Sequence, residues 1–178
     1  MSFVMLAAML VSLPAASQPD TRIHLNKGMT SFDLKNDGIS VTVFSATYDN
    51  NTSHPSDTLN VFIKKGKNWF ILPVPDDDGF TWTNFRLSAS TLQISGYELH
   101  RYKRRIYIIR AVKYTSNSGD GDLTDKLRVR FSRFRLEENT NDPGTSVYYW
   151  APAGIYHTEQ TFEEVNQAFQ TLDMEKFH

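Results

Sequence analysis

The chain alternates apolar and polar residues over many short stretches, and Gly, Asn or Asp ends most of them. A period of two is typical of half-buried strands, because successive side chains point to opposite faces of a sheet. The turn-forming segment 65–68 separates two such stretches and predicts a hairpin. Many short strands with turns between them predict an all-β-dominated fold, a β-sandwich-like pair of packed antiparallel sheets. The clearest strand segments are 22–28, 40–48, 58–74, 104–114 and 126–136.

The last of these segments changes its alternation partway along. The apolar residues of its first half are one residue out of phase with those of its second half. Side chains alternate strictly along a strand, so keeping all of them on one face requires an extra residue. We therefore predict a β-bulge at Ser132 or Arg133. The apolar residues concerned are Leu127, Val129 and Phe131, then Phe134 and Leu136.

Helical periodicity occurs near the C-terminus. Thr161 and Glu164 have the spacing of a capping box, in which each side chain accepts a hydrogen bond from the other's backbone N–H. An apolar stripe follows at helical spacing, which predicts a C-terminal helix of about residues 161–177 packed on a sheet. The stripe consists of Phe162, Val165, Phe169 and Leu172.

The first residues have the pattern of a secretory signal. Residues 1–13 are uncharged and apolar, and Ala15 and Ser17 occupy the small-residue positions before a cleavage site. We therefore expect residues 1–17 to be a signal peptide, residues 18–178 to form a single β-rich domain, and the protein to be periplasmic or secreted. A buried N-terminal helix is the alternative, because the usual positive charge at the start is missing. No other run approaches the ~20 apolar residues of a membrane span.

Composition narrows the chemistry. The chain has 178 residues, enough to bury a sizeable core, and 13% are aromatic, which favours strands. There is no Cys, which excludes disulfides, cysteine nucleophiles and thiolate metal sites.

Charge is divided between two blocks. Residues 101–135 hold eleven Lys/Arg and three Asp, whereas residues 136–178 hold one Lys and eight Asp/Glu. Because the blocks are of similar size and opposite sign, we expect them to neutralise one another, and not to bind nucleic acid.

Catalytic and metal-binding patterns are weak. No nucleophile elbow, S-x-x-K, H-E-x-x-H or P-loop pattern is present, so we expect no catalytic residue, no cofactor and no metal ligand set. Asp33, Asp37 and Gly38 match positions 1, 5 and 6 of a calcium loop, but Lys35 places a cation where an oxygen ligand is needed. The Asp120–Asp125 loop has three Asp and no such cation. A hairpin loop explains it equally well.

The segment from Ile23 to His54, "IHLNKGMTSFDLKNDGISVTVFSATYDNNTSH", resembles the start of the CarG-like proteins, the carbapenem intrinsic-resistance family of exported bacterial proteins. The closing "TFEEVNQAFQTL" resembles the family's last helix. Lys35, and the lack of an Asp soon after Gly38, depart from the family pattern. The resemblance implies a periplasmic, β-rich protein that protects its cell from a carbapenem without hydrolysing it. Its matching positions are Ile23, Leu25, Gly28, Asp33, Leu34, Asp37, Gly38, Asn51 and His54.

Three functions follow, in order of preference. The first is an exported, non-enzymatic protein that confers intrinsic carbapenem resistance. The second is an extracytoplasmic carbohydrate- or peptidoglycan-binding module that uses exposed aromatic residues, and the third is a hydrolase. Partners consistent with these are a β-lactam, a cell-wall component, another protein or a second copy of the chain. The candidate ligand-binding residues are Asn51, His54, Trp82, Tyr149 and Trp150.

Overall fold

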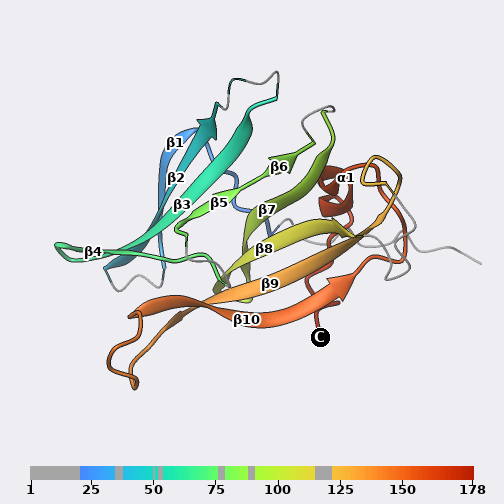
Figure 1. The fold of residues 1–178 in the computed structure, drawn as a ribbon. Coiled ribbons are helices and arrows are strands. Elements are labelled where there is room, and N and C mark those ends of the chain that lie inside the picture. The colour runs from blue at the N-terminus through green and yellow to red at the C-terminus, as the bar shows by residue number, and fades with distance from the viewer. Residues whose placement is uncertain are drawn as a thin grey trace, which may run out of the picture.

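Ten strands and one short helix make up the described part of the chain (Figure 1). The computed structural model describes residues 21–34, 38–49, 51, 54–75, 79–87, 91–114 and 122–178, so the expected signal peptide lies outside the described residues. The elements are β1 (Gly28–Asp33), β2 (Ile39–Tyr48), β3 (Ser56–Lys65), β4 (Asn68–Ile71), β5 (Thr81–Thr83), β6 (Phe85–Arg86), β7 (Gln93–Tyr102), β8 (Arg105–Tyr114), β9 (Arg128–Glu138), β10 (Tyr148–His157) and α1 (Val165–Phe169).

The strands form two antiparallel sheets. The N-terminal sheet has the order β1-β2-β3-β4, with β5 paired to β3 on the same side as β4. The C-terminal sheet has the order β10-β9-β8-β7-β6. The predicted hairpin is confirmed, since Lys65 pairs with Asn68 and Gly66 takes a positive φ of 60°. The predicted fold class, two packed antiparallel sheets with one C-terminal helix, is therefore confirmed.

The main core lies between the two sheets. Alternation places one face of each strand inward: Val41 and Val43 on β2, and Leu59, Val61 and Ile63 on β3, are 0–1% exposed. Burying side chains of this size contributes about 1.5–3 kcal/mol each. The C-terminal sheet completes this core with Leu99, Ile106, Ile108, Phe134, Tyr148 and Trp150.

The C-terminal sheet packs against a core on each of its two faces. This explains the change of alternation in β9 without a bulge. Val129 and Phe131 of β9 pack in a second core, whereas Phe134 packs in the first. The alternation therefore changes because β9 buries one face in its first half and the opposite face in its second. The pairing of β9 with β8 runs without a register shift, so the bulge predicted at Ser132 or Arg133 is wrong. The shift occurs instead in β10, between Pro152 and Ile155.

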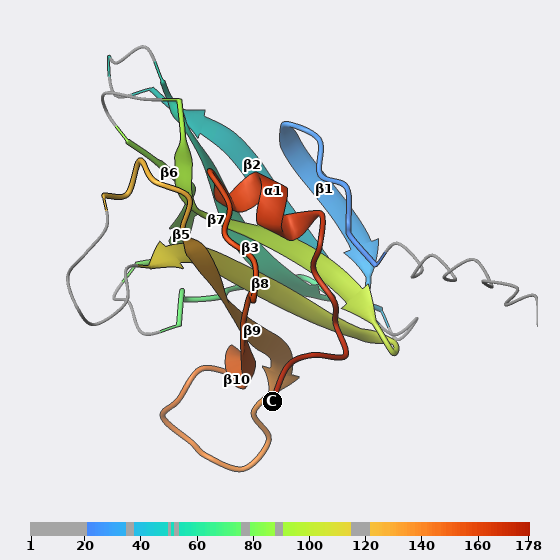
Figure 2. The ribbon, with the colours of Figure 1, turned by 90° about the vertical axis from the view of Figure 1, so that its right-hand side faces the viewer.

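Helix α1 and the residues after it cover the second core. In Figure 2 the helix lies across β7 and β8. It spans Val165–Phe169 and not 161–177, and its N-cap, Glu164, makes no side-chain capping bond. The predicted capping box is absent because Phe162 is extended and exchanges two backbone hydrogen bonds with Leu127, of 2.8 and 3.0 Å. In the described segments, no helix is long and apolar enough to cross a membrane.

The apolar stripe nevertheless packs as expected. Val165 and Phe169 are buried in the second core, and Phe162 and Leu172 are partly buried against it. Met174 and Phe177 extend this cover beyond the helix. One short helix, preceded by the bridge at Phe162 and followed by turns, thus buries the residues for which a longer helix was predicted.

A buried lysine joins this cover to the sheet. The ammonium group of Lys113, 3% exposed, donates to the carbonyl oxygens of Leu123 at 2.7 Å and Asp125 at 2.8 Å, and to that of Glu163. Burial lowers its pKa below the ordinary value, against the attraction of nearby carboxylates. Its three N–H groups therefore satisfy carbonyls from two segments that are far apart in sequence.

Ion pairs also connect the two charge blocks. Lys103 lies 3.1 Å from Glu175, and Lys126 lies 3.4 Å from Glu163. These pairs join residues 101–135 to residues 136–178, as the expected neutralisation requires. Both are exposed, so each contributes only about 0–1 kcal/mol.

Candidate functional site

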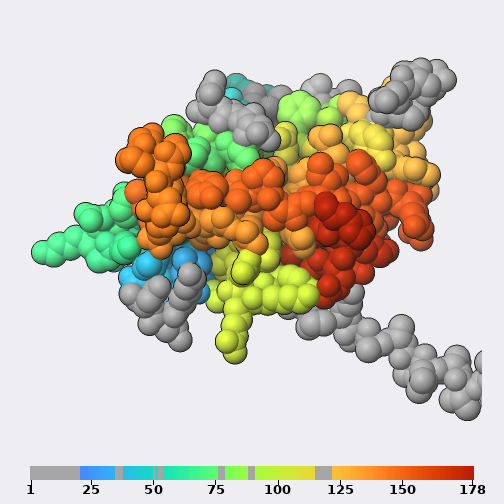
Figure 3. All heavy atoms as spheres, turned by 90° about the horizontal axis from the view of Figure 1, so that it is seen from below, coloured from blue at the N-terminus to red at the C-terminus, as the bar shows by residue number. Residues whose placement is uncertain are grey.

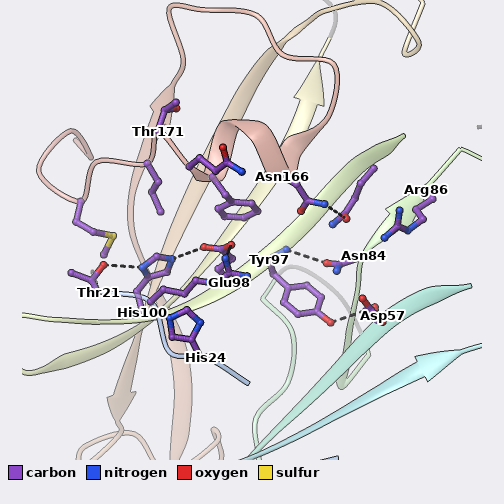
Figure 4. A pocket seen from close by; sticks show the side chains of 16 residues that line it. Thr21, His24, Asp57, Asn84, Arg86, Tyr97, Glu98, His100, Asn166 and Thr171 are labelled. Atoms are coloured by element: carbon purple, nitrogen blue, oxygen red, sulfur yellow. Dashed lines mark hydrogen bonds and ion pairs between the residues drawn. The ribbon is translucent and has the colours of Figure 1, made fainter. Parts of the chain in front are cut away.

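A polar cleft of about 770 Å³ lies where residues 21–24 and the C-terminal segment meet β7 (Figure 4). Such a volume accommodates a small ligand. Side chains from β7 form its floor, and residues of α1 and the turn after it form one wall.

A row of a hydroxyl, an imidazole and a carboxylate stands in this cleft. The Thr21 hydroxyl lies 2.9 Å from Nδ1 of His100, and Nε2 of His100 lies 3.1 Å from Oε2 of Glu98. His100 is 5% exposed and the Glu98 side chain 9%. The order of groups is that of a hydrolytic triad, with a threonine hydroxyl in the place of the nucleophile.

The same row holds the N-terminal segment against β7. Arg22 places its guanidinium 3.0 Å from the other Glu98 oxygen, so the carboxylate is shared. The backbone N–H of Ile23 donates to Leu99 O at 2.8 Å, and that of Arg101 donates to Thr21 O at 2.7 Å. Side-chain and backbone bonds together fix residues 21–23 along the edge of the cleft.

Amides and a tyrosine line the rest of the cleft. Asn166 donates to the buried side chain of Gln93 at 2.9 Å, and the backbone N–H of Tyr97 donates to Asn84 Oδ1 at 3.2 Å. The Tyr97 hydroxyl donates to the Asp57 carbonyl at 3.4 Å. Burial raises the pKa of Tyr97 far above its ordinary value, and the nearby charge of Asp57 adds to this. This wall therefore offers polar groups that remain uncharged at neutral pH.

A second hollow, of about 460 Å³, lies beside the turn from β7 to β8 and shares no lining residue with the cleft. We call it the arginine pocket. In the view from below, the yellow-green turn lies beside the blue end of β1 and the orange ends of β9 and β10 (Figure 3). The residues that line it include three arginines, Arg104, Arg105 and Arg135, and three apolar residues, Leu34, Ile39 and Leu136.

The two carboxylates at the pocket already have cationic partners. Glu137 pairs with Arg135. Glu138 accepts from Lys65 and from the Tyr148 hydroxyl, both at 3.2 Å. The hydrogen bond to Glu138 raises the pKa of Lys65, and burial raises the pKa of Tyr148. Both shifts keep the proton on Lys65 and on Tyr148 at neutral pH, so both groups remain hydrogen-bond donors to Glu138.

The structure does not bring the predicted ligand-binding residues together. Trp82 and Trp150 are each 4% exposed and belong to the core between the sheets, so the expectation that they are exposed is wrong. Tyr149 is 37% exposed and donates to Glu137 at 3.3 Å. Asn51 and His54 lie in the β2–β3 connection, at the opposite end of the molecule from the start of β10 (Figures 1 and 2).

The side chains that could bind a metal ion are also dispersed. Among the described residues, no three His, Asp or Glu side chains are grouped so that they could hold a metal ion. Asp33 ends β1, while Asp37 and Asp120 lie outside the described residues. Asp122 and Asp125 close a turn, since the backbone N–H of Asp122 donates to Asp125 Oδ2 at 3.1 Å.

Sequence reasoning missed both hollows, although each left a trace in the sequence. Glu98 and His100 stand two apart, so they share a face of β7. Arg104 and Arg105 close the consecutive basic run 103–105. Arg135 and Thr21 are distant in sequence, and only the folded chain brings them to these sites.

Comparison with known proteins agrees with this fold. A family model described as "Carbapenem resistance protein CarG-like" matches residues 25–171. The chain is also similar to the crystal structure of CarG, with 29% sequence identity and a TM-score of 0.79, over 89% of this chain and 99% of that one. No curated protein matches the chain. The resemblance found in Ile23–His54 thus extends over most of the sequence, and the chain belongs to the CarG-like family of carbapenem resistance proteins.

Proposed function

We propose that this protein is exported and protects its cell from a carbapenem without hydrolysing it. The observation that carries the proposal is the family match over residues 25–171, which includes the described strands and most of the residues at both hollows. The assignment to carbapenem resistance comes from the description of the matched family. The apolar residues 1–13 and the small residues before Gln18 support export.

The contacts of Glu98 support protection without turnover. In a catalytic triad the carboxylate orients the histidine and stabilises the imidazolium that forms. Here Arg22 lies 3.0 Å from one oxygen of that carboxylate and His100 lies 3.1 Å from the other. A guanidinium on the same carboxylate weakens its stabilisation of an imidazolium, because the like charges repel. The row therefore suits the attachment of residues 21–23 better than acyl transfer.

The test combines cells and purified protein. Expression of the full chain in a carbapenem-susceptible bacterium should raise the inhibitory concentration, and a chain without residues 2–17 should protect less. The purified protein should leave the ultraviolet absorbance of the drug unchanged for hours. An enzyme turning over at ~1 s⁻¹ would clear a large excess within an hour.

The matched control is Thr21→Val, which removes the hydroxyl of the row and keeps the side-chain shape. Protection equal to that of the unsubstituted protein is expected. Drug hydrolysis that scales with protein concentration and disappears in Thr21→Val would overturn the proposal and assign a hydrolase. If the full-length chain gives no protection, the proposed role in carbapenem resistance is wrong.

A further inference from the structure

The turn that borders the arginine pocket has a costly backbone conformation. Lys103 and Arg104 have φ values of 47° and 62°, the left-handed region, between the paired residues Tyr102 and Arg105. Two-residue hairpin turns of this kind favour Asn-Gly, because side chains with a Cβ are strained there. Lys103 is held by Glu175, whereas Arg104 has no hydrogen bond or ion pair to any described residue. The turn therefore carries an arginine that local structure does not require.

The arginines around the pocket differ in whether they form ion pairs. Arg135 is paired with Glu137, which fixes it in the wall. Arg105, like Arg104, is exposed and makes no ion pair within the described part of the chain. The lining holds three arginines and two glutamates, and Lys65 and Tyr148 engage one of the glutamates. Among the residues that the structure describes, the uncompensated charge at the pocket is therefore positive.

The pocket lining also contains apolar residues. Leu34 and Leu136 are half-buried, and Ile39 is 8% exposed. A guanidinium presents two parallel N–H groups that match a carboxylate, which gives direction as well as charge. A hollow lined by arginines and apolar residues fits a compact molecule that has a hydrocarbon body and a single carboxylate.

We infer that the arginine pocket is the carbapenem-binding site, where Arg104 and Arg105 take the carboxylate of the drug and Leu34, Ile39 and Leu136 contact its ring system. This inference rests on the proposed function and names the site at which it operates. A carbapenem has one carboxylate on a small fused bicycle, which is the chemistry that this pocket recognises. Protection then follows from retention of the intact drug.

The test measures binding of tebipenem and of its pivoxil ester, in which the same carboxylate is masked, by calorimetry on the purified protein. Tebipenem should bind in a 1:1 ratio, more weakly at high salt, and the ester should bind at least tenfold more weakly. Arg104→Gly and Arg105→Gln should each weaken tebipenem binding about tenfold or more, as the loss of a charge-assisted hydrogen bond does. Arg104→Gly relieves the strained turn, so its melting temperature should not fall.

The matched control is Arg130→Gln, which removes the same charge from an exposed position of β9 outside the pocket. It should bind tebipenem as tightly as the unsubstituted protein. Equal binding of acid and ester, equal loss in the control, or no binding would overturn the inference. Cells that remain protected by the Arg104→Gly, Arg105→Gln double variant would overturn it too, while the proposed function would stand. Unprotected cells with the unsubstituted protein would instead refute the proposed function.

Discussion

Arg133 donates two hydrogen bonds to the carbonyl oxygen of Ala153, from Nε at 3.0 Å and from Nη2 at 2.7 Å. Ala153 lies in the register shift of β10, where two residues oppose one on β9. Nη1 of Arg133 donates to Met174 O at 2.9 Å, and the guanidinium lies 4.6 Å from the ring centre of Phe177. One side chain thus joins the bulge to the C-terminal segment.

The first prediction concerns this fork. Arg133→Lys keeps the charge but cannot reproduce three directed donors, so the free energy of unfolding should fall by about 1.5–3 kcal/mol. Urea denaturation followed by tryptophan fluorescence measures this. Arg130→Lys, at an exposed position of the same strand, should stay within about 0.5 kcal/mol of the unsubstituted protein. Equal effects of the two changes would mean that the fork does not hold the C-terminal segment.

The second prediction concerns the cover over the second core. Phe169 is 8% exposed and packs against Phe131, with ring centroids 5.3 Å apart. Phe169→Ala should therefore lower the free energy of unfolding by about 3–5 kcal/mol. Thr161 is exposed and caps no helix, so Thr161→Ala should change it by less than about 0.5 kcal/mol. Thermal and urea melts compare the two, and a larger loss for Thr161→Ala would contradict the packing described here.

These cases show how far the sequence determines the structure. Alternation in 40–48 and 58–65 predicts the N-terminal sheet, because the buried residues of the middle of each strand, Val41 and Val43 in β2 and Leu59, Val61 and Ile63 in β3, lie on one face. The same reasoning fails for β9, because its first half is buried in the second core and its second half in the core between the sheets. Alternation alone does not show which core buries a given residue. The predicted helix was too long because the apolar stripe indicates only which residues are buried. The backbone at Phe162 is extended instead of helical, because Phe162 pairs with Leu127.

The candidate sites were less predictable than the fold. Trp82 and Trp150 were expected to be exposed, but both side chains are buried in the core between the sheets. The cleft joins Thr21 to His100, and the arginine pocket joins Leu34 to Arg104. Contacts between segments so distant in sequence depend on sheet packing, which local patterns do not encode.

The third prediction concerns alkaline pH. Burial raises the pKa of the Tyr97 hydroxyl above the 10.0 of an unfolded chain. The folded state therefore binds more protons above pH 10, so stability that is fully present below pH 10 decreases as the pH rises beyond it. Tyr97→Phe removes this group, and its free energy of unfolding should fall less between pH 9 and 11 in urea titrations. Parallel pH profiles for the two proteins would show that Tyr97 is not buried as a protonated hydroxyl.

The fourth prediction separates attachment from catalysis at the hydroxyl–imidazole–carboxylate row. Glu98→Gln removes the carboxylate that serves Arg22 and His100 at once, so both lose a negatively charged partner. Breaking such a bond costs about 1–3 kcal/mol. The bonds that hold residues 21–23 should then open more often, and amide hydrogens of Ile23 and Arg101 should exchange faster.

Carbapenem protection provides the decisive comparison. If the row only attaches the N-terminal segment, Glu98→Gln should protect cells in proportion to the amount of folded protein, because no step on the drug uses the carboxylate. Thr21→Val serves as the milder change, since it removes one hydrogen bond of the row and leaves the Arg22–Glu98 pair intact. Protection lost in both variants while their hydrogen exchange stays normal would contradict attachment and assign the row a chemical role. Faster exchange with protection retained is the expected result, because Glu98 lies between Arg22 and His100, and the arginine pocket is lined by other residues.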